Sequence, residues 1–273
     1  MVSIMGVLNV TPDSFYDKSR FIDYPKAIAH AHQMIAHGAC IIDVGGESTR
    51  PGAQSICVSQ ECDRVLPIIQ ALAKDFKHDN TMTLSIDTRH PEVMRQAIEC
   101  GAGFINDVNA LQGEMTEALQ ALLNTLAQHN LPVCLMHMQG EPSSMQIKPE
   151  YTDVVLEVKH FLESRLHFCV AKGLKQEQII LDPGFGFGKT VEHNTQLLKN
   201  LDQFKALGTR VLVGLSRKSF IEKWLQAPAI AEDRLAGSLA ASVIAVLNGA
   251  DIIRTHDVKA TVDAVKIAEI FKL

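Results

Sequence analysis

The sequence has no apolar run close to the roughly 18 residues of a membrane span, and no basic segment followed by an apolar one at its start. Its six cysteines include no C-x-x-C pair, which favours free thiols over a zinc site. The net charge of -5 argues against a broad nucleic-acid surface, although local cations can still hold a small anionic substrate. These absences predict a cytoplasmic protein with no membrane and no nucleic-acid partner.

No interdomain linker or low-complexity tract interrupts the 273 residues, and 47% of them are hydrophobic, enough for one large core. The length matches the roughly 250 residues typical of a (β/α)8 barrel. We therefore expect a single domain spanning residues 1–273.

Apolar runs alternate with amphipathic stretches along the whole chain. The runs predict strands at 3–9, 40–45, 83–87, 104–107, 132–137, 179–182, 211–215 and 251–254. The stretches predict helices at 25–37, 60–76, 91–99, 114–129, 151–172, 192–202, 232–248 and 258–272. This alternation predicts an α/β fold, the (β/α)8 TIM barrel, with an open doubly wound sheet as the alternative.

Three segments repeat one pattern, in which a glycine ends a helical stretch and an alanine and an apolar run follow. The glycines are Gly38, Gly101 and Gly249, and glycine there suits a left-handed helix end. The residue five positions after each glycine is polar, and we expect it at the carboxyl end of a strand: Asp43, Asn106 and Arg254. The other predicted strands end at Asn9, Asp87, His137, Asp182 and Ser216.

Polar side chains at that end of a barrel are where such enzymes place catalysis. Any single one of them is explained equally well as a cap on the following helix, but eight together favour an active site. Carboxylates and amides match the edge of an aminopyrimidine ring, and the cations Arg50, Arg217, Lys218, Arg254 and His256 suit a phosphorylated group. The alternative is that these cations only pair with the acids in a structural network.

The segment 182–190 ends in Gly-Lys-Thr, as a phosphate-binding P-loop does. Pro183 stands where that loop needs its first glycine, and proline has no N–H to offer a phosphate. We instead expect backbone held close to a flat ligand, with Phe187 stacking on it.

Taken together, these segments resemble the dihydropteroate synthase family over nearly the whole chain. The resemblance rests on GVLNVTPDSF at 6–15, DVGGESTRPG at 43–52, SIDT at 85–88, INDV at 105–108, MHMQG at 136–140, DPGFGFGK at 182–189, SRKS at 216–219 and RTHDV at 254–258. It implies a transferase of folate biosynthesis, a sulfonamide target, that condenses 6-hydroxymethyl-7,8-dihydropterin pyrophosphate with p-aminobenzoate to give 7,8-dihydropteroate. It also implies Mg²⁺ and a homodimer built through helices late in the chain.

The resemblance also implies roles for individual residues. Asp87, Asn106, Asp182 and Lys218 would hold the pterin edge, while Met136, Phe187 and Arg254 would lie against its faces. Met138 is the alternative to Met136, on the expectation that strand alternation turns one of the two away. Asn9 would bind Mg²⁺ and, with Arg254 and His256 and with Arg50 nearby, the pyrophosphate; Phe15, Thr49, Pro51, Ser216, Arg217 and Ser219 would shape the p-aminobenzoate site. Lys218, Arg254, Asp87 and Arg50 are the predicted catalytic residues.

Two departures from the family stand out. Tyr16-Asp17-Lys18-Ser19 replaces the family's frequent Ser-Asp-Gly-Gly, so Phe15 is the least secure assignment. The first strand starts almost at the first residue, from which we expect a less covered barrel floor. We expect a dissociative reaction, since an electron-rich dihydropterin stabilises a cation. The alternatives are a folate-dependent methyltransferase, a Schiff-base aldolase using Lys218, and a non-catalytic pterin-binding paralogue.

Overall fold

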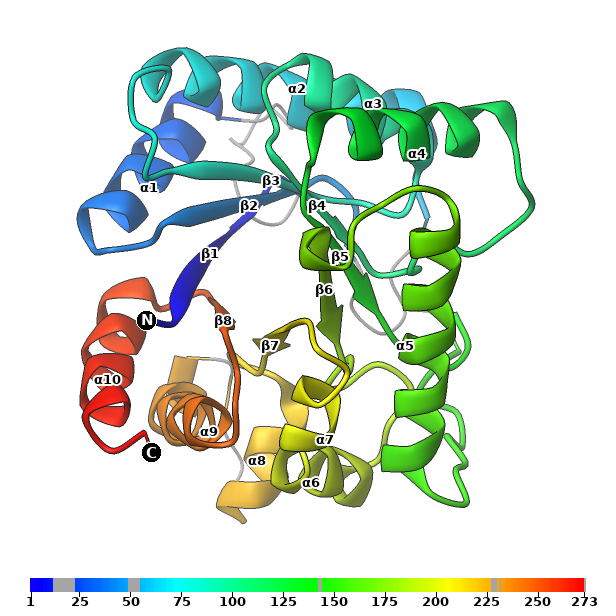
Figure 1. The fold of residues 1–273 in the computed structure, drawn as a ribbon. Helices are drawn as coiled ribbons and strands as arrows, with labels where there is room; N and C mark the ends of the chain where they lie inside the picture. Colours follow the sequence, from blue (N-terminus) through cyan, green and yellow to red (C-terminus); the bar gives the residue numbers. More distant parts are fainter. Residues whose placement is uncertain (12–22, 49–54, 142–143, 227–229, 231, 273) are drawn as a thin grey trace.

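The strands of the computed structural model close into a barrel in which each strand is parallel to the next and β8 pairs with β1 (Figure 1). The structure describes residues 1–11, 23–48, 55–141, 144–226, 230 and 232–272. The strands are β1 (Ser3–Asn9), β2 (Ile41–Gly45), β3 (Thr83–Asp87), β4 (Phe104–Asp107), β5 (Val133–Met136), β6 (Ile179–Asp182), β7 (Arg210–Gly214) and β8 (Ile252–Thr255). The (β/α)8 barrel is confirmed, and each predicted strand end lies within one residue of the observed one.

Helices surround the barrel and cover the outward side chains of its strands (Figure 1). They are α1 (Tyr24–Ala36), α2 (Val58–Asp75), α3 (Pro91–Glu99), α4 (Glu117–His129), α5 (Val154–Ala171), α6 (Val191–Lys199), α7 (Asp202–Lys205), α8 (Ser219–Leu225), α9 (Leu235–Leu247) and α10 (Val258–Ile270), with 3-10 turns η1 (Gln176–Gln178) and η2 (Glu232–Arg234). No helix in these described ranges is long and apolar enough to cross a membrane.

Two features of the helical layer differ from the prediction. The stretch expected as one helix at 192–202 is divided between α6 and the single turn of α7. The seven residues of α8 were not predicted at all, because fewer than two turns show too little periodicity to separate a helix from a loop. The repeated glycines are confirmed as left-handed helix ends, with φ of +101° at Gly38, +112° at Gly101 and +108° at Gly249.

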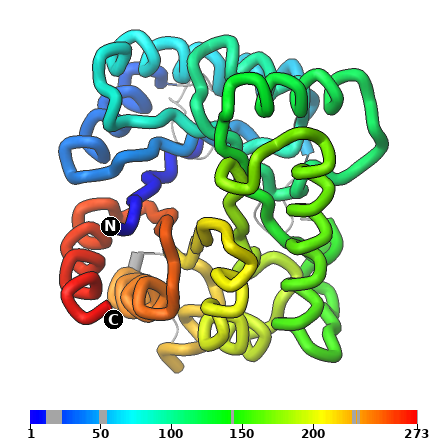
Figure 2. The backbone as a smooth tube through the Cα atoms, in the orientation of Figure 1, coloured from blue at the N-terminus to red at the C-terminus, as the bar shows by residue number. Residues whose placement is uncertain are grey.

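The two ends of the chain close the barrel together, as Figure 2 shows with β1 in blue beside β8 and α10 in orange and red. Inside, strand alternation sends every second side chain inward. The lower layer of inward side chains is apolar and buried: Met5, Ile41, Phe104, Cys134, Ile180, Leu212 and Ile252. The next inward residues toward the carboxyl ends of the strands are therefore the ones that face the barrel mouth.

Candidate active site

A buried carboxylate lies at the centre of the layer above that apolar floor. Asp43 is wholly buried and is the inward residue that follows Ile41 on β2. It accepts hydrogen bonds from Ser85 Oγ at 2.5 Å, Asn106 Nδ2 at 2.8 Å and Arg254 Nε at 2.6 Å. The prediction that Asp43 ends its strand was wrong: β2 continues to Gly45, so Asp43 supports the rim from below.

Arg254 links this support to the mouth itself. Its Nη2 donates to Asp87 Oδ2 at 2.6 Å, while its Nε is held by Asp43. The other oxygen of the Asp87 carboxylate, Oδ1, is buried and has no hydrogen-bond partner among the described residues. Burial raises the pKa of Asp87, and Arg254 opposes that rise. An acceptor left in this state at a barrel mouth is suited to receive an N–H donor from a ligand.

Asp182 and Lys218 face the same mouth from β6 and from the end of the segment after β7. Asp182 Oδ1 accepts from the backbone N–H of Gly184 at 2.7 Å. Lys218 Nζ donates to the carbonyl of Phe185 and lies 4.6 Å from the centre of the Phe187 ring. Burial lowers the pKa of Lys218 to about 8, with Asp182 acting in the opposite direction. The predicted pterin-edge residues and Phe187 are therefore brought together.

Met136 is the last residue of β5 and shares its inward face with Cys134. Its register partner on β6 is Asp182, so it belongs to the layer at the mouth. The expectation that alternation separates Met136 from Met138 was wrong, because residues two apart along a strand point to the same side. Met136 is still on β5, whereas Met138 lies beyond the end of the strand, and this favours Met136 as the residue at the mouth.

The glycines of the loop after β6 serve a contact within the protein. Gly184 has φ +71°, and a Cβ there would lie 1.8 Å from the carbonyl oxygen of His137. At Gly188, with φ +62°, a Cβ would lie 2.3 Å from the carbonyl oxygen of Gln139. Both glycines therefore allow this loop to approach the loop after β5 closely. The expectation that its backbone lies against a flat ligand stays a prediction.

Lys189 joins the same two loops and is almost completely buried. Its Nζ lies 2.9 Å from His137 Nδ1 and donates to the carbonyls of His137 at 3.2 Å and Phe187 at 3.0 Å. Burial lowers its pKa well below the usual range, with Asp182 opposing. Two of its three polar contacts are with the loop after β5 and one is within its own loop, which indicates a structural role, in agreement with the rejection of a phosphate-binding loop.

The segment after β7 and the end of β8 are tied together by Ser216, whose Oγ lies 3.1 Å from His256 Nδ1. Arg217 has φ +60° and makes a two-pronged ion pair with Asp257, at 2.9 and 2.6 Å. Ser219 begins α8 and is exposed. The alternative that the cations only pair with acids thus holds for Arg217, which pairs with Asp257, and in part for Arg254, which pairs with Asp43 and Asp87.

Asn9 ends β1 beside the mouth. A Cβ at Gly45 would lie 3.7 Å from Asn9 Oδ1 and 3.6 Å from Asp87 Oδ2, so these two oxygens flank the bare glycine. No group of three His, Cys, Asp or Glu side chains in the described part of the chain is placed to hold a metal. An amide oxygen at the mouth fits Mg²⁺, which takes most of its ligands from phosphate and water.

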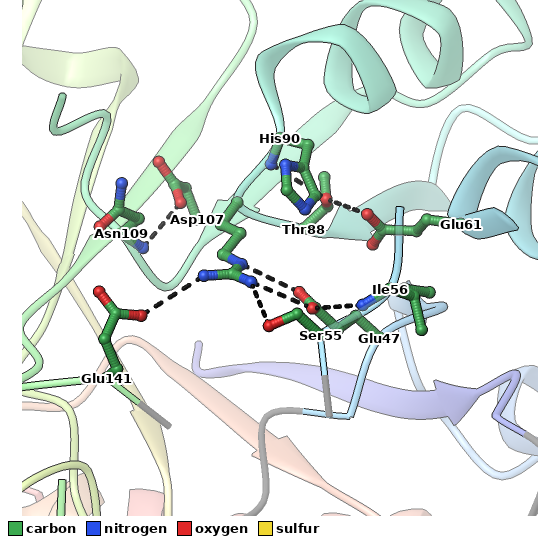
Figure 3. A network of polar contacts seen from close by, with 10 residues as sticks. Glu47, Ser55, Ile56, Glu61, Thr88, His90, Asp107, Asn109 and Glu141 are labelled. Atoms are coloured by element: carbon green, nitrogen blue, oxygen red, sulfur yellow. Dashed lines mark hydrogen bonds and ion pairs between the residues drawn. The ribbon is translucent and has the colours of Figure 1, made fainter. Parts of the chain in front are cut away.

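Four predicted residues, Phe15, Thr49, Arg50 and Pro51, lie outside the described residues. Asp43 was predicted among the polar strand-end residues but was given no role in the site, and Arg89 was not predicted at all. A lone aspartate inside the otherwise apolar strand IIDVG was the available signal for Asp43. Nothing in the sequence pattern marks Arg89, whose contacts come from two distant loops (Figure 3).

Comparison with known proteins connects this geometry to one group of enzymes. The family described as "Pterin binding enzyme" matches residues 5–256. The dihydropteroate synthase of Escherichia coli K12 is 46% identical over 266 residues, covering 97% of this chain and 90% of that one. The Yersinia pestis dihydropteroate synthase in a sulfonamide drug complex has a TM-score of 0.88 at 44% identity, over 99% of this chain and 94% of that one. The Xanthomonas albilineans enzyme with 4-aminobenzoic acid also has a TM-score of 0.88, at 42% identity, over 99% and 93% of the two chains.

Proposed function

Since this chain belongs to the dihydropteroate synthase family of pterin-binding enzymes, we propose how its own residues perform that family's reaction. The chain is a transferase that joins 6-hydroxymethyl-7,8-dihydropterin pyrophosphate to p-aminobenzoate, giving 7,8-dihydropteroate and pyrophosphate. The relatives favour this synthase over the methyltransferase alternative. We propose the residue roles, the metal and the oligomeric state below on the support of the geometry.

The pterin edge is assigned to the residues gathered at the mouth. Asp87 offers its unpartnered Oδ1 to a ring N–H or amino group, and Asp182 offers a second carboxylate. Asn106 contributes an amide that Asp43 already orients through Nδ2. Lys218 supplies a donor for the pterin carbonyl, and Phe187 and Met136 cover the ring faces. The carboxylates are fixed before the ligand arrives, so little ordering cost remains at binding.

The pyrophosphate is assigned to the cationic side of the rim, with His256 and Arg254 as donors and Asn9 as the Mg²⁺ ligand. When bound, Mg²⁺ would neutralise the charge that grows on the leaving pyrophosphate. Arg254 is held by Asp43 and Asp87 at 2.6 Å each, which fixes its guanidinium in one place and leaves its Nη1 for an anion or a ring face.

We propose a dissociative substitution. The bond between the exocyclic carbon and the pyrophosphate oxygen breaks, and its electron pair leaves with pyrophosphate. The lone pair of the p-aminobenzoate nitrogen then forms the new C–N bond, and that nitrogen releases a proton to solvent. Asp87 and Asp182 favour this path because two carboxylates beside the ring stabilise the intervening pterin cation. No side-chain nucleophile takes part.

The observation that carries the proposal is the buried Asp87 oxygen, which has no hydrogen-bond partner in the described part of the chain and lies among polar side chains that match the pterin edge. The test measures pyrophosphate release with Mg²⁺, with and without p-aminobenzoate, alongside dihydropteroate formation. We expect equal amounts of both products, a loss on the order of 100-fold or more in kcat/KM for Asp87→Asn, and competition between a sulfonamide and p-aminobenzoate. A covalent pterin–protein adduct seen by mass spectrometry would contradict the dissociative path, and pterin binding without any release would indicate the paralogue.

We also propose a homodimer formed through α9 and α10. These two helices pack side by side and leave large apolar side chains exposed: Ile244, Leu247, Ile267, Ile270 and, just beyond α10, Phe271. A cluster of this kind on adjacent helices is typical of a surface covered by a partner. The second copy is the occupant that the family resemblance supports.

A further inference from the structure

Arg89 contacts two other loops at the barrel mouth, and its partners Glu47, Ser55 and Glu141 are labelled in Figure 3. It follows β3, and its Nε and Nη2 donate to the two oxygens of Glu47 at 3.1 and 3.2 Å. Nη2 also donates to Ser55 Oγ at 3.1 Å. Glu47 in turn accepts from the backbone N–H of Ile56 at 3.2 Å. Glu47 lies at the start of the β2–α2 connection and Ser55 and Ile56 near its end, so Arg89 and Glu47 hold those two ends together.

The Arg89–Glu47 pair is the strong member of this network. Its two parallel bonds match a guanidinium fork to a carboxylate, and the Glu47 side chain is only 8% exposed. By contrast, the contact with Glu141 in the loop after β5 spans 3.5 Å, and that side chain is 69% exposed. Exposed ion pairs contribute little. The fixed geometry therefore concerns the β2–α2 connection.

The backbone that carries Arg89 is itself anchored. Thr88, the residue before it, is buried and donates from Oγ1 to Glu61 Oε2 of α2 at 2.9 Å. The same Oγ1 accepts from the backbone N–H of His90 at 3.2 Å. Glu61 is wholly buried. Arg89 consequently projects from a rigid point, two residues beyond the pterin-edge Asp87.

The pterin-edge side chains do not depend on Arg89. Asp87 is oriented by Arg254, Asn106 by Asp43, and Asp182 by the Gly184 N–H. Loss of the Arg89 side chain leaves each of those bonds in place. Its effect is expected instead on whatever the β2–α2 connection binds.

We propose that Arg89, through its fork on Glu47, is a positioning residue for p-aminobenzoate: it touches no reacting atom but holds both ends of the connection at the rim. This inference rests on the proposed function, because the family resemblance assigns Thr49 and Pro51 of that connection to the second substrate. Proteins position binding loops by fixing their ends to the scaffold, and small displacements of a positioned group are costly.

The experiment compares Arg89→Ala, Arg89→Lys and Glu47→Gln with wild type in steady-state assays that vary each substrate separately. Arg95→Ala is the matched control, since Arg95 on α3 also pairs with two glutamates, Glu92 and Glu99, but both of these lie on α3 itself. Pterin affinity is measured directly by titration calorimetry, and the melting temperature reports folding.

We expect the KM for p-aminobenzoate to rise on the order of 10-fold or more in Arg89→Ala, with kcat and pterin affinity within about twofold of wild type. Arg89→Lys should rescue little, because an ammonium cannot reproduce the fork. Arg89→Ala and Glu47→Gln should be non-additive when combined. Arg95→Ala should match wild type.

An unchanged KM for p-aminobenzoate in folded Arg89→Ala overturns the inference while the function stands. A parallel fall in pterin affinity, kcat and melting temperature also overturns it, since it would show a merely structural role. A wild-type chain that forms no dihydropteroate would remove the proposed function first, and the inference with it.

Discussion

At the scale of single residues, the site contains charged groups whose pKa values are shifted by burial. Asp87 and Asp182 both have raised pKa values, caused first by burial and opposed by Arg254 and Lys218 respectively. The same burial lowers the pKa of Lys218 to about 8. Buried carboxylates without hydrogen-bond partners cost free energy, and a ligand that brings N–H donors would supply those hydrogen bonds.

The lowered pKa of Lys218 predicts a pH dependence of pterin binding. Because the folded-state pKa is about 8, the ammonium is present below that pH and is lost as the pH rises through it. We expect pterin affinity to fall by up to about 10-fold per pH unit above 8. Lys218→Arg, which stays charged, should bind more weakly but with a flat profile from pH 8 to about 9.5. Calorimetric titration with 6-hydroxymethyl-7,8-dihydropterin measures both; a flat wild-type profile would contradict the role of the ammonium.

At the scale of elements, the mouth is held together by contacts between neighbouring loops. The loops after β5 and β6 meet at Gly184 and Gly188 and are joined by Lys189. The connection between β2 and α2 is joined to β3 by Arg89. The rim residues therefore stand on loops fixed to each other as well as on strands.

Gly184 tests how much this loop contact matters. A Cβ there meets the His137 carbonyl oxygen at 1.8 Å, whereas Gly113 has φ +117° and no atom within 4 Å of its added Cβ. Both substitutions by alanine carry backbone strain of about 1–3 kcal/mol, but only Gly184→Ala must also separate the two loops. We expect Gly184→Ala to exceed Gly113→Ala by about 2 kcal/mol or more in urea unfolding, with a loss of pterin binding. An equal loss of unfolding free energy in the two variants would show that the two loops can separate at little cost.

At the scale of the whole molecule, α9 and α10 leave several large apolar side chains exposed after the barrel is complete. Ile267 on α10 is 59% exposed and Leu247 on α9 is 45% exposed, although both helices already bury their inner faces against the barrel. Burial of such side chains against a second copy is favourable by roughly 25 cal/mol per Å².

Ile267→Glu is therefore expected to weaken the proposed homodimer, because it places a charge in the proposed apolar contact. We predict a rise in the dimer dissociation constant of about 30-fold or more, measured by analytical ultracentrifugation across protein concentrations. Ile147→Glu is the control: Ile147 is 75% exposed but lies in the loop after β5. Identical sedimentation of wild type and Ile267→Glu would place the contact elsewhere, and a monomeric wild type would contradict the dimer.

The sequence alone determined the strands, the barrel and the identity of most rim residues. These features are local: a buried parallel strand is a short apolar run, a left-handed helix end takes glycine, and the polar residue that follows must lie at the mouth. The resemblance to the family came from the same rim segments. Hence the sequence predicts as neighbours the rim residues Asp87, Asn106, Asp182, Lys218 and Arg254.

Only the tertiary structure decided which of these groups bond to each other. Arg254 and Asp43 are 211 positions apart, and Arg89 and Glu47 are 42 apart, so no local period reports their pairing. The close approach of Gly184 and Gly188 to the loop after β5 is likewise not visible in the sequence. Partner choice depends on barrel closure and stagger, which bring distant strand ends together. The physical reason is that the local sequence pattern determines the direction in which a side chain points, while the closure of the barrel determines which distant residues it contacts.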